Sequence, residues 1–210
     1  MEIQYRWPDA KILIFAKTPV VGEVKTRLIP SLGDEGACSL YLTLLTDTVA
    51  RFARAGLSPV ELVVWPDIRH RDIQHLASQH SVSLSLQRGQ DLGERMLHAA
   101  TDALMDRQSV VLIGTDCPGL EVELVDQCLS SLAQGEQAAL IPADDGGYVL
   151  IGLTQTHSSL FDDIEWGSDQ VAGVTRERLR DLGWSFKEWS SLWDVDRAED
   201  LDRYYAITRP

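Results

Sequence analysis

The sequence predicts an α/β fold: a three-layer α/β/α domain built around a mostly parallel sheet. Short apolar runs typical of strands alternate with segments of helical periodicity, at intervals that suit helices on both faces of such a sheet. A chain of 210 residues with 44% hydrophobic residues can bury one sizeable core and is short for two domains. No internal repeat or linker divides it, so we expect a single domain over residues 1–210.

The first third of the chain supplies two regular elements and a long loop. Lys11–Lys17 is a short apolar run, which predicts a strand buried on both faces. Thr18–Gly33 has two prolines and two glycines and no strand or helix periodicity, which predicts a long ordered loop. Loops of this length in compact domains usually either have a function or are disordered. Asp34–Ala55 repeats apolar residues at helical spacing between a capping Asp34 and Gly56, which predicts a helix.

The middle of the chain alternates strands with helices. Val60–Trp65 and the strictly alternating Ser81–Gln87 predict strands on either side of a short helix, Ile68–Gln79. Asp91–Met105 places leucine and methionine on one helical face. Ser109–Gly114 is the most hydrophobic run of the chain, so we expect it to form a central strand.

The last third continues the alternation. The segments AALIPA and YVLIGL predict two strands separated by the turn Asp144–Gly147. The other expected elements are a helix over Glu121–Ala133, a helix over Asp169–Leu182, an edge strand over Trp184–Trp189 and a closing helix over Arg197–Tyr205. Because open sheets of this type bind ligands beyond the carboxyl ends of their strands, the residues after each strand are the candidate site residues.

Charge and composition exclude several classes of protein. The formal net charge is -13, whereas phosphate backbones are bound by clustered Lys and Arg, so we expect no nucleic acid partner and no binding to anionic membranes. A small anionic ligand remains compatible, since two or three local cations can hold a phosphate. No apolar stretch approaches the roughly 20 residues that cross a bilayer, and the first residues are too polar for a secretion signal. Three cysteines without paired or metal-type spacing suit the cytoplasm, and we assign them no chemistry.

Three cations follow the first strand: Lys17, Lys25 and Arg27. Arg offers a bidentate fork and Lys a point charge, so together they are suited to clamp phosphates. Their spacing matches neither the phosphate loop with Gly-Lys-Ser or Gly-Lys-Thr nor the dinucleotide fingerprint with three close glycines. The alternative is that Lys25 and Arg27 form an ordinary solvated surface pair.

Acidic residues follow two other apolar segments. Asp116 comes soon after the most hydrophobic strand, where a carboxylate together with water and substrate phosphates suits Mg²⁺ or Mn²⁺. Asp194 and Asp196 stand close together before the closing helix. The alternative at both places is a cap, since Asp often caps a helix or a turn. The presence of both acidic sites in a chain with a cationic loop favours metal binding.

The segment Arg88–Met96 joins a strand to a helix and has two glycines. The backbone amides at Gly89 and Gly93 are candidates for close approach to a base or ribose, because glycine has no side chain to obstruct a ligand. The alternative is a plain turn with a helix cap at Asp91.

The turn at residues 144–147 is a further candidate for nucleotide binding, through Asp145 and Gly146. The negative charges of two adjacent acidic side chains repel each other, which is unfavourable unless the side chains are solvated or bound to a cation. The alternative is a tight hairpin turn with no further role.

Six strings stand in this order along the chain: FAKTPVVGEVKTRL, DLGERM, LIGTDCPGL, ADDGGYVLIGL, DIEW and DVDRAEDL. Together they resemble the bacterial transferases similar to 2-phospholactate guanylyltransferase. That family belongs to the nucleotide-diphospho-sugar transferase superfamily, with the glycosyltransferase A fold, and some members are linked to arsenosugar biosynthesis. The resemblance covers about Lys11 to Leu201, and its first, third and fourth strings are fairly specific.

The resemblance implies roles for five residues. Lys25 and Arg27 are expected to contact nucleotide phosphates, and Asp116 to be the metal-binding acid of the fold. An acidic residue near the carboxyl end completes the metal site in related nucleotidyltransferases, and it maps here to Asp194 or Asp196. The implied cofactor is Mg²⁺ or Mn²⁺.

The chain departs from the family pattern at two places. It has Trp166-Gly167-Ser168 where the family often has Trp-Ser-Thr, and Arg197-Ala198 where Thr-Pro is common. The first departure removes a hydroxyl at residue 167, for which Ser168 is the candidate substitute.

The resemblance implies a metal-dependent enzyme that uses a nucleotide-sugar or a nucleoside triphosphate. Glycosyl transfer to a small acceptor is favoured, and the alternative is a guanylyltransferase-like nucleotidyltransferase acting on a phosphorylated small molecule with release of pyrophosphate. A non-catalytic nucleotide-binding protein is a further alternative, since fold alone does not establish activity. The expected partners are the nucleotide and the acceptor, with a homodimer possible.

Overall fold

The computed structural model describes residues 4–208, so residues 1–3 and 209–210 of the predicted domain lie outside the described residues. A sheet of seven strands has the order β3-β2-β1-β4-β6-β5-β7. Its strands are β1 Ala10–Lys17, β2 Val60–Trp65, β3 Ser83–Leu86, β4 Ser109–Ile113, β5 Ala138–Pro142, β6 Tyr148–Leu153 and β7 Phe186–Glu188. The strand β6 runs antiparallel to β4 and β5, while the other neighbouring pairs are parallel. The predicted α/β class and the mostly parallel sheet are therefore confirmed.

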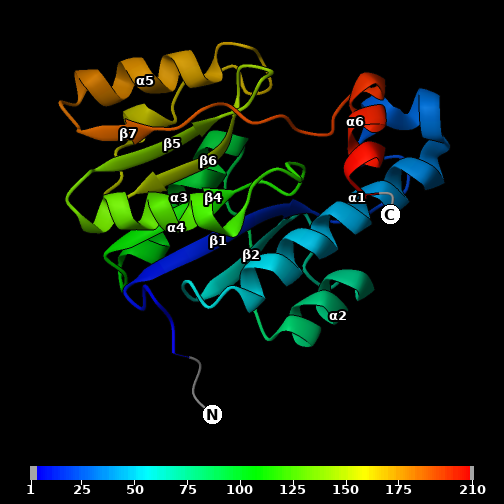
Figure 1. Ribbon diagram of the computed structural model, residues 1–210, viewed down its shortest axis with the longest axis horizontal. Helices are drawn as coiled ribbons and strands as arrows, with labels where there is room; N and C mark the ends of the chain where they lie inside the picture. The colour runs from blue at the N-terminus through cyan, green and yellow to red at the C-terminus, as the bar shows by residue number, and fades with distance from the viewer. Residues whose placement is uncertain (1–3, 209–210) are drawn as a thin grey trace.

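Helices cover both faces of this sheet (Figure 1). They are α1 Ile29–Arg54, α2 Arg71–His80, α3 Leu92–Leu104, α4 Val122–Ala133, α5 Val171–Asp181 and α6 Ala198–Thr208, with short 3-10 turns η1 Thr26–Leu28 and η2 Ser158–Leu160. Side chains of α1, α2 and α4 pack on one face of the sheet, and those of α3 and α5 pack on the other. All five residues of β4 are buried, as expected for a central strand.

The expected loop over residues 18–33 is shorter than the sequence indicated. The turn η1 occupies Thr26–Leu28, and α1 begins at Ile29 rather than at Asp34. A proline in the first turn favours an earlier start, because its fixed φ suits the first helical positions. Helical geometry is interrupted at Gly33, with φ 72° and ψ 168°, so the predicted helix is the part of α1 after this kink.

The carboxyl-terminal segment returns to α1 at one end of the sheet (Figure 1). Trp193 and Val195 pack with Leu28 and Leu40 in a small cluster that also includes residues of α6. The amide of Val195 donates a 2.8 Å hydrogen bond to the carbonyl of Asp116. These contacts bring residues 194–196 to the carboxyl end of β4.

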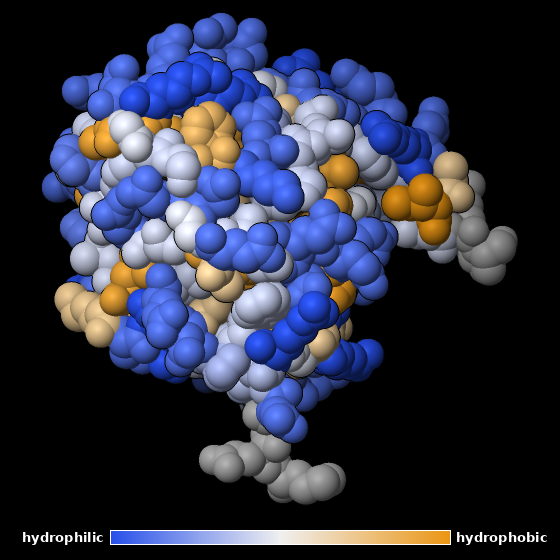
Figure 2. All heavy atoms as spheres, turned by 60° about the vertical axis from the view of Figure 1, so that its left-hand side comes forward, coloured by the Kyte–Doolittle hydropathy of each residue, from blue (hydrophilic) through white to orange (hydrophobic). Residues whose placement is uncertain are grey.

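The surface shown in Figure 2 is mostly hydrophilic, with hydrophobic residues scattered in small groups. No helix within residues 4–208 is long and apolar enough to span a membrane. Cys38, Cys117 and Cys128 are buried and free, which agrees with the absence of paired spacing.

Candidate functional site

A cavity of about 620 Å³ lies at the carboxyl ends of β1, β2 and β4, and we call it the main cavity. Its charged lining residues are Lys17, Glu23, Lys25, Arg27, Arg95, Asp116 and Asp196. Four of these seven are cations, although the whole chain has a net charge of -13. The ends of parallel strands thus gather positive charge where open α/β sheets bind ligands.

Lys25 is the most enclosed cation of the main cavity. Its side chain is only 6% exposed, and Nζ lies 2.9 Å from Asp116 Oδ2 and 3.6 Å from Asp196 Oδ1. Burial lowers the pKa of Lys25, but the carboxylates of Asp116 and Asp196 outweigh burial and raise it above its ordinary value. The ammonium is therefore charged at neutral pH and joins two acidic segments.

The backbone at Lys25 adopts a left-handed conformation, with φ 47° and ψ 43°. For a residue with a long side chain this conformation costs on the order of 1 kcal/mol. The surrounding loop holds it, since the amide of Leu28 donates a 2.9 Å hydrogen bond to the carbonyl of Lys25. Backbone strain of this kind is common at functional sites, where the orientation of a side chain is fixed by its surroundings.

Asp116 stands in the turn after β4 and points toward the loop after β1. Although burial raises its pKa, the nearby ammonium of Lys25 holds the pKa of Asp116 below its ordinary range. Asp116 does not cap the next helix, because α4 begins at Val122 after Glu121. Arg51 of α1 anchors the turn by donating hydrogen bonds to the carbonyls of Pro118 and Leu120, at 3.0 and 2.7 Å.

Asp194 and Asp196 flank the fully buried Val195. The backbone bends at Val195, and both Asp194 and Asp196 line one cleft beside the main cavity. Asp196 accepts a hydrogen bond from Arg27 and lies in the main cavity. Asp196 does not stand at the N-cap position, since α6 begins at Ala198, and the carboxylate of Asp200 accepts from the amides of residues 196 and 197 at 3.0 and 2.7 Å.

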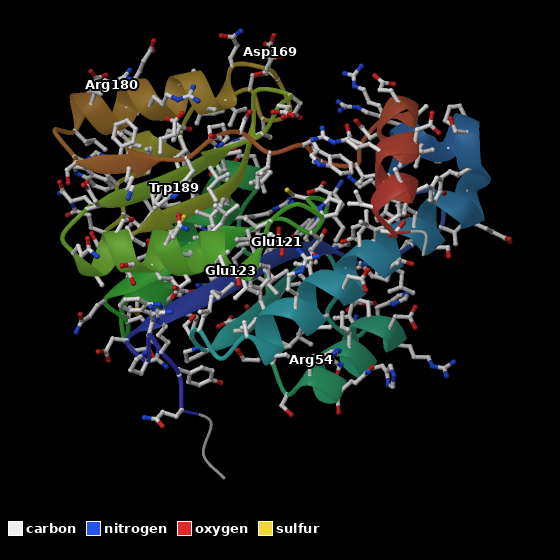
Figure 3. The ribbon with its side chains drawn as sticks, in the orientation of Figure 1. Arg54, Glu121, Glu123, Asp169, Arg180 and Trp189 are labelled. Atoms are coloured by element: carbon white, nitrogen blue, oxygen red, sulfur yellow. The ribbon has the colours of Figure 1, made fainter. Side chains whose placement is uncertain are left out.

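Asp194 is the least compensated of these acids. Burial first, and then the carboxylates of Asp116 and Asp145, raise the pKa of Asp194 to about 6. It lines a cleft of about 480 Å³ between α6 and the start of α5, where Asp169 is labelled in Figure 3. We call this the acidic cleft. Ionising several neighbouring carboxylates costs free energy because their negative charges repel one another. A bound cation offsets this repulsion, so such a cleft favours cation binding.

The donor set fits a hard divalent ion that is only partly coordinated by protein. Asp116, Asp194 and Asp196 offer carboxylate oxygens, the ligands preferred by Mg²⁺ and Mn²⁺. Among residues 4–208, no group of three or more His, Cys, Asp or Glu side chains forms a ready metal cage. Mg²⁺ usually takes one or two carboxylates and completes its shell with water and substrate phosphates, so the residues present suit that mode of binding.

Arg95, from the candidate segment Arg88–Met96, completes the main cavity on the side of β2 together with two residues that the sequence did not single out, Trp65 and Gln87. The guanidinium of Arg95 lies 3.7 Å from the centre of the Trp65 ring, a cation–π contact at the end of β2. Gln87 is 5% exposed, and its Nε2 donates to the carbonyls of Ala16 and Val63 at 3.1 and 2.9 Å.

These two amide hydrogen bonds fix the orientation of the Gln87 side chain. Its Oε1 accepts no hydrogen bond within the described residues, and the side chain lines the main cavity. This oxygen is not among the buried side-chain atoms without partners, so it is open to the cavity and can accept a hydrogen bond from a ligand N–H or O–H. Together with the flat Arg95 and Trp65 groups, this edge of the cavity suits a base or ribose.

Lys17, at the end of β1, is exposed and also lines the main cavity. Tyr41 of α1 holds the backbone there, accepting from the Lys17 amide at 2.7 Å and donating to the Lys17 carbonyl at 2.8 Å. The structure thus brings together Lys17, Lys25, Arg27, Asp116 and Asp196 around one cavity.

Four of the residues expected to bind nucleotide do not line the main cavity: Gly89, Gly93, Asp145 and Gly146. A Cβ at Gly93 would lie 2.5 Å from the carbonyl of Phe161 and 2.8 Å from Trp166 Nε1, so glycine allows α3 to pack there. Asp91 caps α3 by accepting from the Glu94 amide at 2.9 Å, which is the alternative considered for that turn. Asp145 lies instead on the acidic cleft.

Comparisons with known proteins agree with the fold described above. The model of a family described as "Uncharacterized protein conserved in bacteria (DUF2064)" matches residues 48–168. A search of curated proteins found no match. Among solved structures, the chain is similar to a "putative nucleotide-diphospho-sugar transferase" from Desulfovibrio desulfuricans, with 33% identity over 96% of this chain and 88% of that one and a TM-score of 0.87.

More distant structures share the fold. CMP:2-keto-3-deoxy-manno-octonic acid synthetase complexed with CTP is 11% identical, with 95% of this chain and 98% of that one covered and a TM-score of 0.60. The 4-diphosphocytidyl-2C-methyl-D-erythritol synthase from Anaerococcus prevotii is 13% identical, with 96% and 97% covered and a TM-score of 0.60. At these identities the likeness concerns the fold alone.

Proposed function

We propose, on the premise that this chain belongs to the bacterial family DUF2064 and is an enzyme of the nucleotide-diphospho-sugar transferase superfamily, that it is a metal-dependent transferase with a nucleotide-sugar as donor. The observation that carries the proposal is the position of Lys25. Its ammonium stands between the carboxylates of Asp116 and Asp196 in a cavity that also holds Arg27. Carboxylates and cations gathered in one cavity are suited to a divalent ion and to phosphates at once.

The donor is proposed to lie along the main cavity. Its nucleoside is placed against Trp65, Arg95 and Gln87, where stacking and one hydrogen-bond acceptor are available. Its diphosphate is placed against Lys25 and Arg27, whose charges offset those of the phosphate oxygens.

The divalent ion is proposed to be held by Asp116 and by one or both of Asp194 and Asp196. When bound, Mg²⁺ or Mn²⁺ acts as a Lewis acid that stabilises negative charge on the leaving diphosphate. Lys25 and Arg27 contribute to the same end, since their cations face the oxygens on which that charge develops.

The favoured reaction is glycosyl transfer to a hydroxyl of a small acceptor. The acceptor oxygen forms a bond to the anomeric carbon, and the bond from that carbon to the β-phosphate oxygen breaks. The electron pair of the broken bond leaves with the nucleoside diphosphate, and the acceptor proton passes to a carboxylate and then to water.

A nucleotidyltransferase is the second candidate, and the number of cations in the main cavity favours it. Lys17, Lys25, Arg27 and Arg95 all line this cavity, and a triphosphate needs more neutralisation of its charge than a diphosphate does. In that reaction a phosphorylated acceptor attacks the α-phosphorus and pyrophosphate departs. A protein that binds nucleotide without turnover of any acceptor would instead be non-catalytic.

A thermal-shift screen of nucleoside triphosphates and nucleotide-sugars, with Mn²⁺ or Mg²⁺, tests the donor class, because selective binding to the folded state raises the melting temperature. For the ligand found, Asp116→Asn is expected to lower metal-dependent turnover about 100-fold or more. Asp106→Asn is the matched control, because this exposed carboxylate lies before the amino end of β4, whereas Asp116 follows its carboxyl end. Unchanged turnover in Asp116→Asn would remove this residue from the mechanism.

A further inference from the structure

A smaller cavity of about 190 Å³, which we call the apolar pocket, opens beside the main cavity. It lies on the face of the sheet covered by α3 and α5. Phe15, Leu92 and Gly114 line both cavities, so a group in the apolar pocket is next to a ligand in the main cavity. A Cβ at Gly114 would lie 3.1 Å from Asp116 Oδ1, which places this shared wall directly beside the proposed metal-binding carboxylate.

The walls of the apolar pocket are aromatic and aliphatic. Tyr148 and Trp166 meet edge to face, with ring centroids 6.3 Å apart and an angle of 89°. The Tyr148 hydroxyl has only a 3.6 Å contact to the sulfur of Met96, a weak acceptor. The volume slightly exceeds that of a cavity of about 150 Å³, which holds one benzene. The pocket therefore suits a ring-sized group with an apolar face.

Polar groups lie at the mouth of the apolar pocket. Asp145 Oδ1 accepts from the Gly147 amide at 2.9 Å, while its Oδ2 receives no hydrogen bond within the described residues. The Ser168 oxygen accepts a long 3.4 Å hydrogen bond from the Gln170 amide, so its own hydrogen is available to a ligand. Asp145 is the only charged side chain among the described residues that line this pocket. A phosphate or carboxylate would be repelled there, whereas a hydroxyl can donate to Asp145.

We propose, as an extension that rests on the function proposed above, that the apolar pocket holds the acceptor, and that this acceptor is an uncharged molecule with a ring-sized apolar face and a hydroxyl. The hydroxyl faces Asp145. As its oxygen bonds to the anomeric carbon of the donor, its proton passes to Asp145 and then to water, while the nucleoside diphosphate leaves with the electron pair of the broken bond. A phosphorylated acceptor has no cation to meet it in this pocket.

Two probes with the same ring and different charge test this assignment: benzyl alcohol and benzyl phosphate. Saturation-transfer NMR titrations of the full chain give the affinity of each. We expect benzyl alcohol to bind more tightly, and Ser168→Phe, which fills the mouth of the pocket, to weaken its binding by about tenfold or more. Ser78→Phe is the matched control, because Ser78 is exposed on α2, away from both cavities.

A second variant keeps the shape of the pocket in case Ser168→Phe does not fold. Asp145→Asn removes the charge at the mouth, so it is expected to strengthen binding of benzyl phosphate several-fold relative to benzyl alcohol. The acceptor assignment is overturned if benzyl phosphate binds the parent chain as tightly as benzyl alcohol, or if neither variant changes either affinity. A parent chain that binds these probes but no nucleotide would overturn the proposed function itself, which the thermal-shift screen detects separately.

Discussion

Lys25 Nζ lies 2.9 Å from Asp116 Oδ2, across a sequence separation of 91 residues. This contact ties the loop after β1 to the turn after β4, and Asp196 adds a third segment at 3.6 Å. The Lys25 side chain is 6% exposed, whereas that of Asp116 is 38% exposed. The cation is therefore enclosed by protein, while its carboxylate partner remains open to the cavity and to a ligand.

Replacing Lys25 by methionine is expected to destabilise the fold by about 1–3 kcal/mol, because removing one partner of an enclosed ion pair leaves the other uncompensated. The estimate is below that for a fully buried pair, since solvent screens Asp116. Mn²⁺ is expected to raise the melting temperature of Lys25→Met more than that of the parent, because the ion compensates the freed carboxylates. Differential scanning calorimetry with and without Mn²⁺ measures both effects.

Lys11→Met is the matched control for this prediction. Lys11 Nζ lies 3.0 Å from Glu61 Oε2, and the two side chains are 18% and 19% exposed. Because one carboxylate alone offers a poor site for a divalent ion, Mn²⁺ is expected to restore little stability to this variant. Equal restoration of both variants would contradict a specific cation site at Asp116.

Asp194→Asn is expected to stabilise the metal-free protein at pH 7.5, in contrast to most substitutions. Burial and the neighbouring carboxylates raise the folded-state pKa of Asp194 to about 6, above its ordinary value of 3.8. The unfolded chain thus releases its proton first, and stability falls as the pH rises from about 4 to about 6. Because Asp194 is partly exposed, we discount the gain at neutral pH to on the order of 1 kcal/mol.

Urea denaturation in EDTA at pH 4 and at pH 7.5 measures this effect. The gain from Asp194→Asn is expected at pH 7.5 and is expected to be much smaller at pH 4, where the folded state carries the proton and the unfolded chain is only about half ionised. Asp169→Asn, an exposed carboxylate on the same acidic cleft, serves as the control and is expected to give no comparable gain. Equal stabilisation at both pH values would show that the charge of Asp194 is not the cause.

Gln87→Met is expected to weaken nucleotide binding about tenfold, because the ligand loses the hydrogen bond to Oε1. Binding of pyrophosphate, which has no base or ribose, is expected to stay within about twofold of the parent on the same grounds. The variant also removes the two side-chain hydrogen bonds to the carbonyls of Ala16 and Val63, so it is expected to lose about 1–3 kcal/mol of stability.

Isothermal titration calorimetry with the nucleotide and with pyrophosphate separates these contributions. Gln90→Met is the control, since Gln90 is exposed and lies outside the main cavity. If Gln87→Met weakened both ligands equally, the loss would reflect general damage to the cavity rather than a contact to the nucleoside.

Local patterns predicted most of the secondary structure. Each expected strand exists, and the fully buried β4 occupies the central position that its hydrophobicity indicated. The start of α1 was placed five residues too late, because the break at Gly33 resembles a loop boundary in sequence although the chain is already helical at Ile29. Periodicity describes one element at a time, so it carried no information about the order of the strands.

The part of the site that could not be predicted depends on contacts between distant segments. Asp116 and Asp196 come to one cavity because Val195 packs on α1 and its amide bonds to the carbonyl of Asp116. Gln87 appeared only as the last residue of a predicted strand, since the carbonyls that orient it belong to β1 and β2. The cationic residues were recognisable because charge within a loop rich in glycine and proline is visible without knowledge of the fold.

Gly146→Ala adds only one methyl group but is expected to destabilise the fold strongly. Gly146 has φ 92°, and a Cβ there would lie 2.2 Å from the carbonyl oxygen of Asp169. The added methyl must displace this backbone, so we expect a loss of about 2–4 kcal/mol from overpacking and strain. The amide of Ala172 donates a 2.8 Å hydrogen bond to the Gly146 carbonyl, so the start of α5 would shift with the turn.

That shift would also reach the apolar pocket, which the turn and the segment before α5 line together. Affinity for benzyl alcohol is therefore expected to fall in Gly146→Ala, while nucleotide affinity in the main cavity changes little. Gly173→Ala is the matched control: it lies in α5, a Cβ there meets no atom within 4 Å, and alanine is expected to add up to about 1 kcal/mol of stability. Thermal unfolding of the two variants compares them directly, and equal melting temperatures would show that the close approach of Gly146 to Asp169 does not constrain the turn.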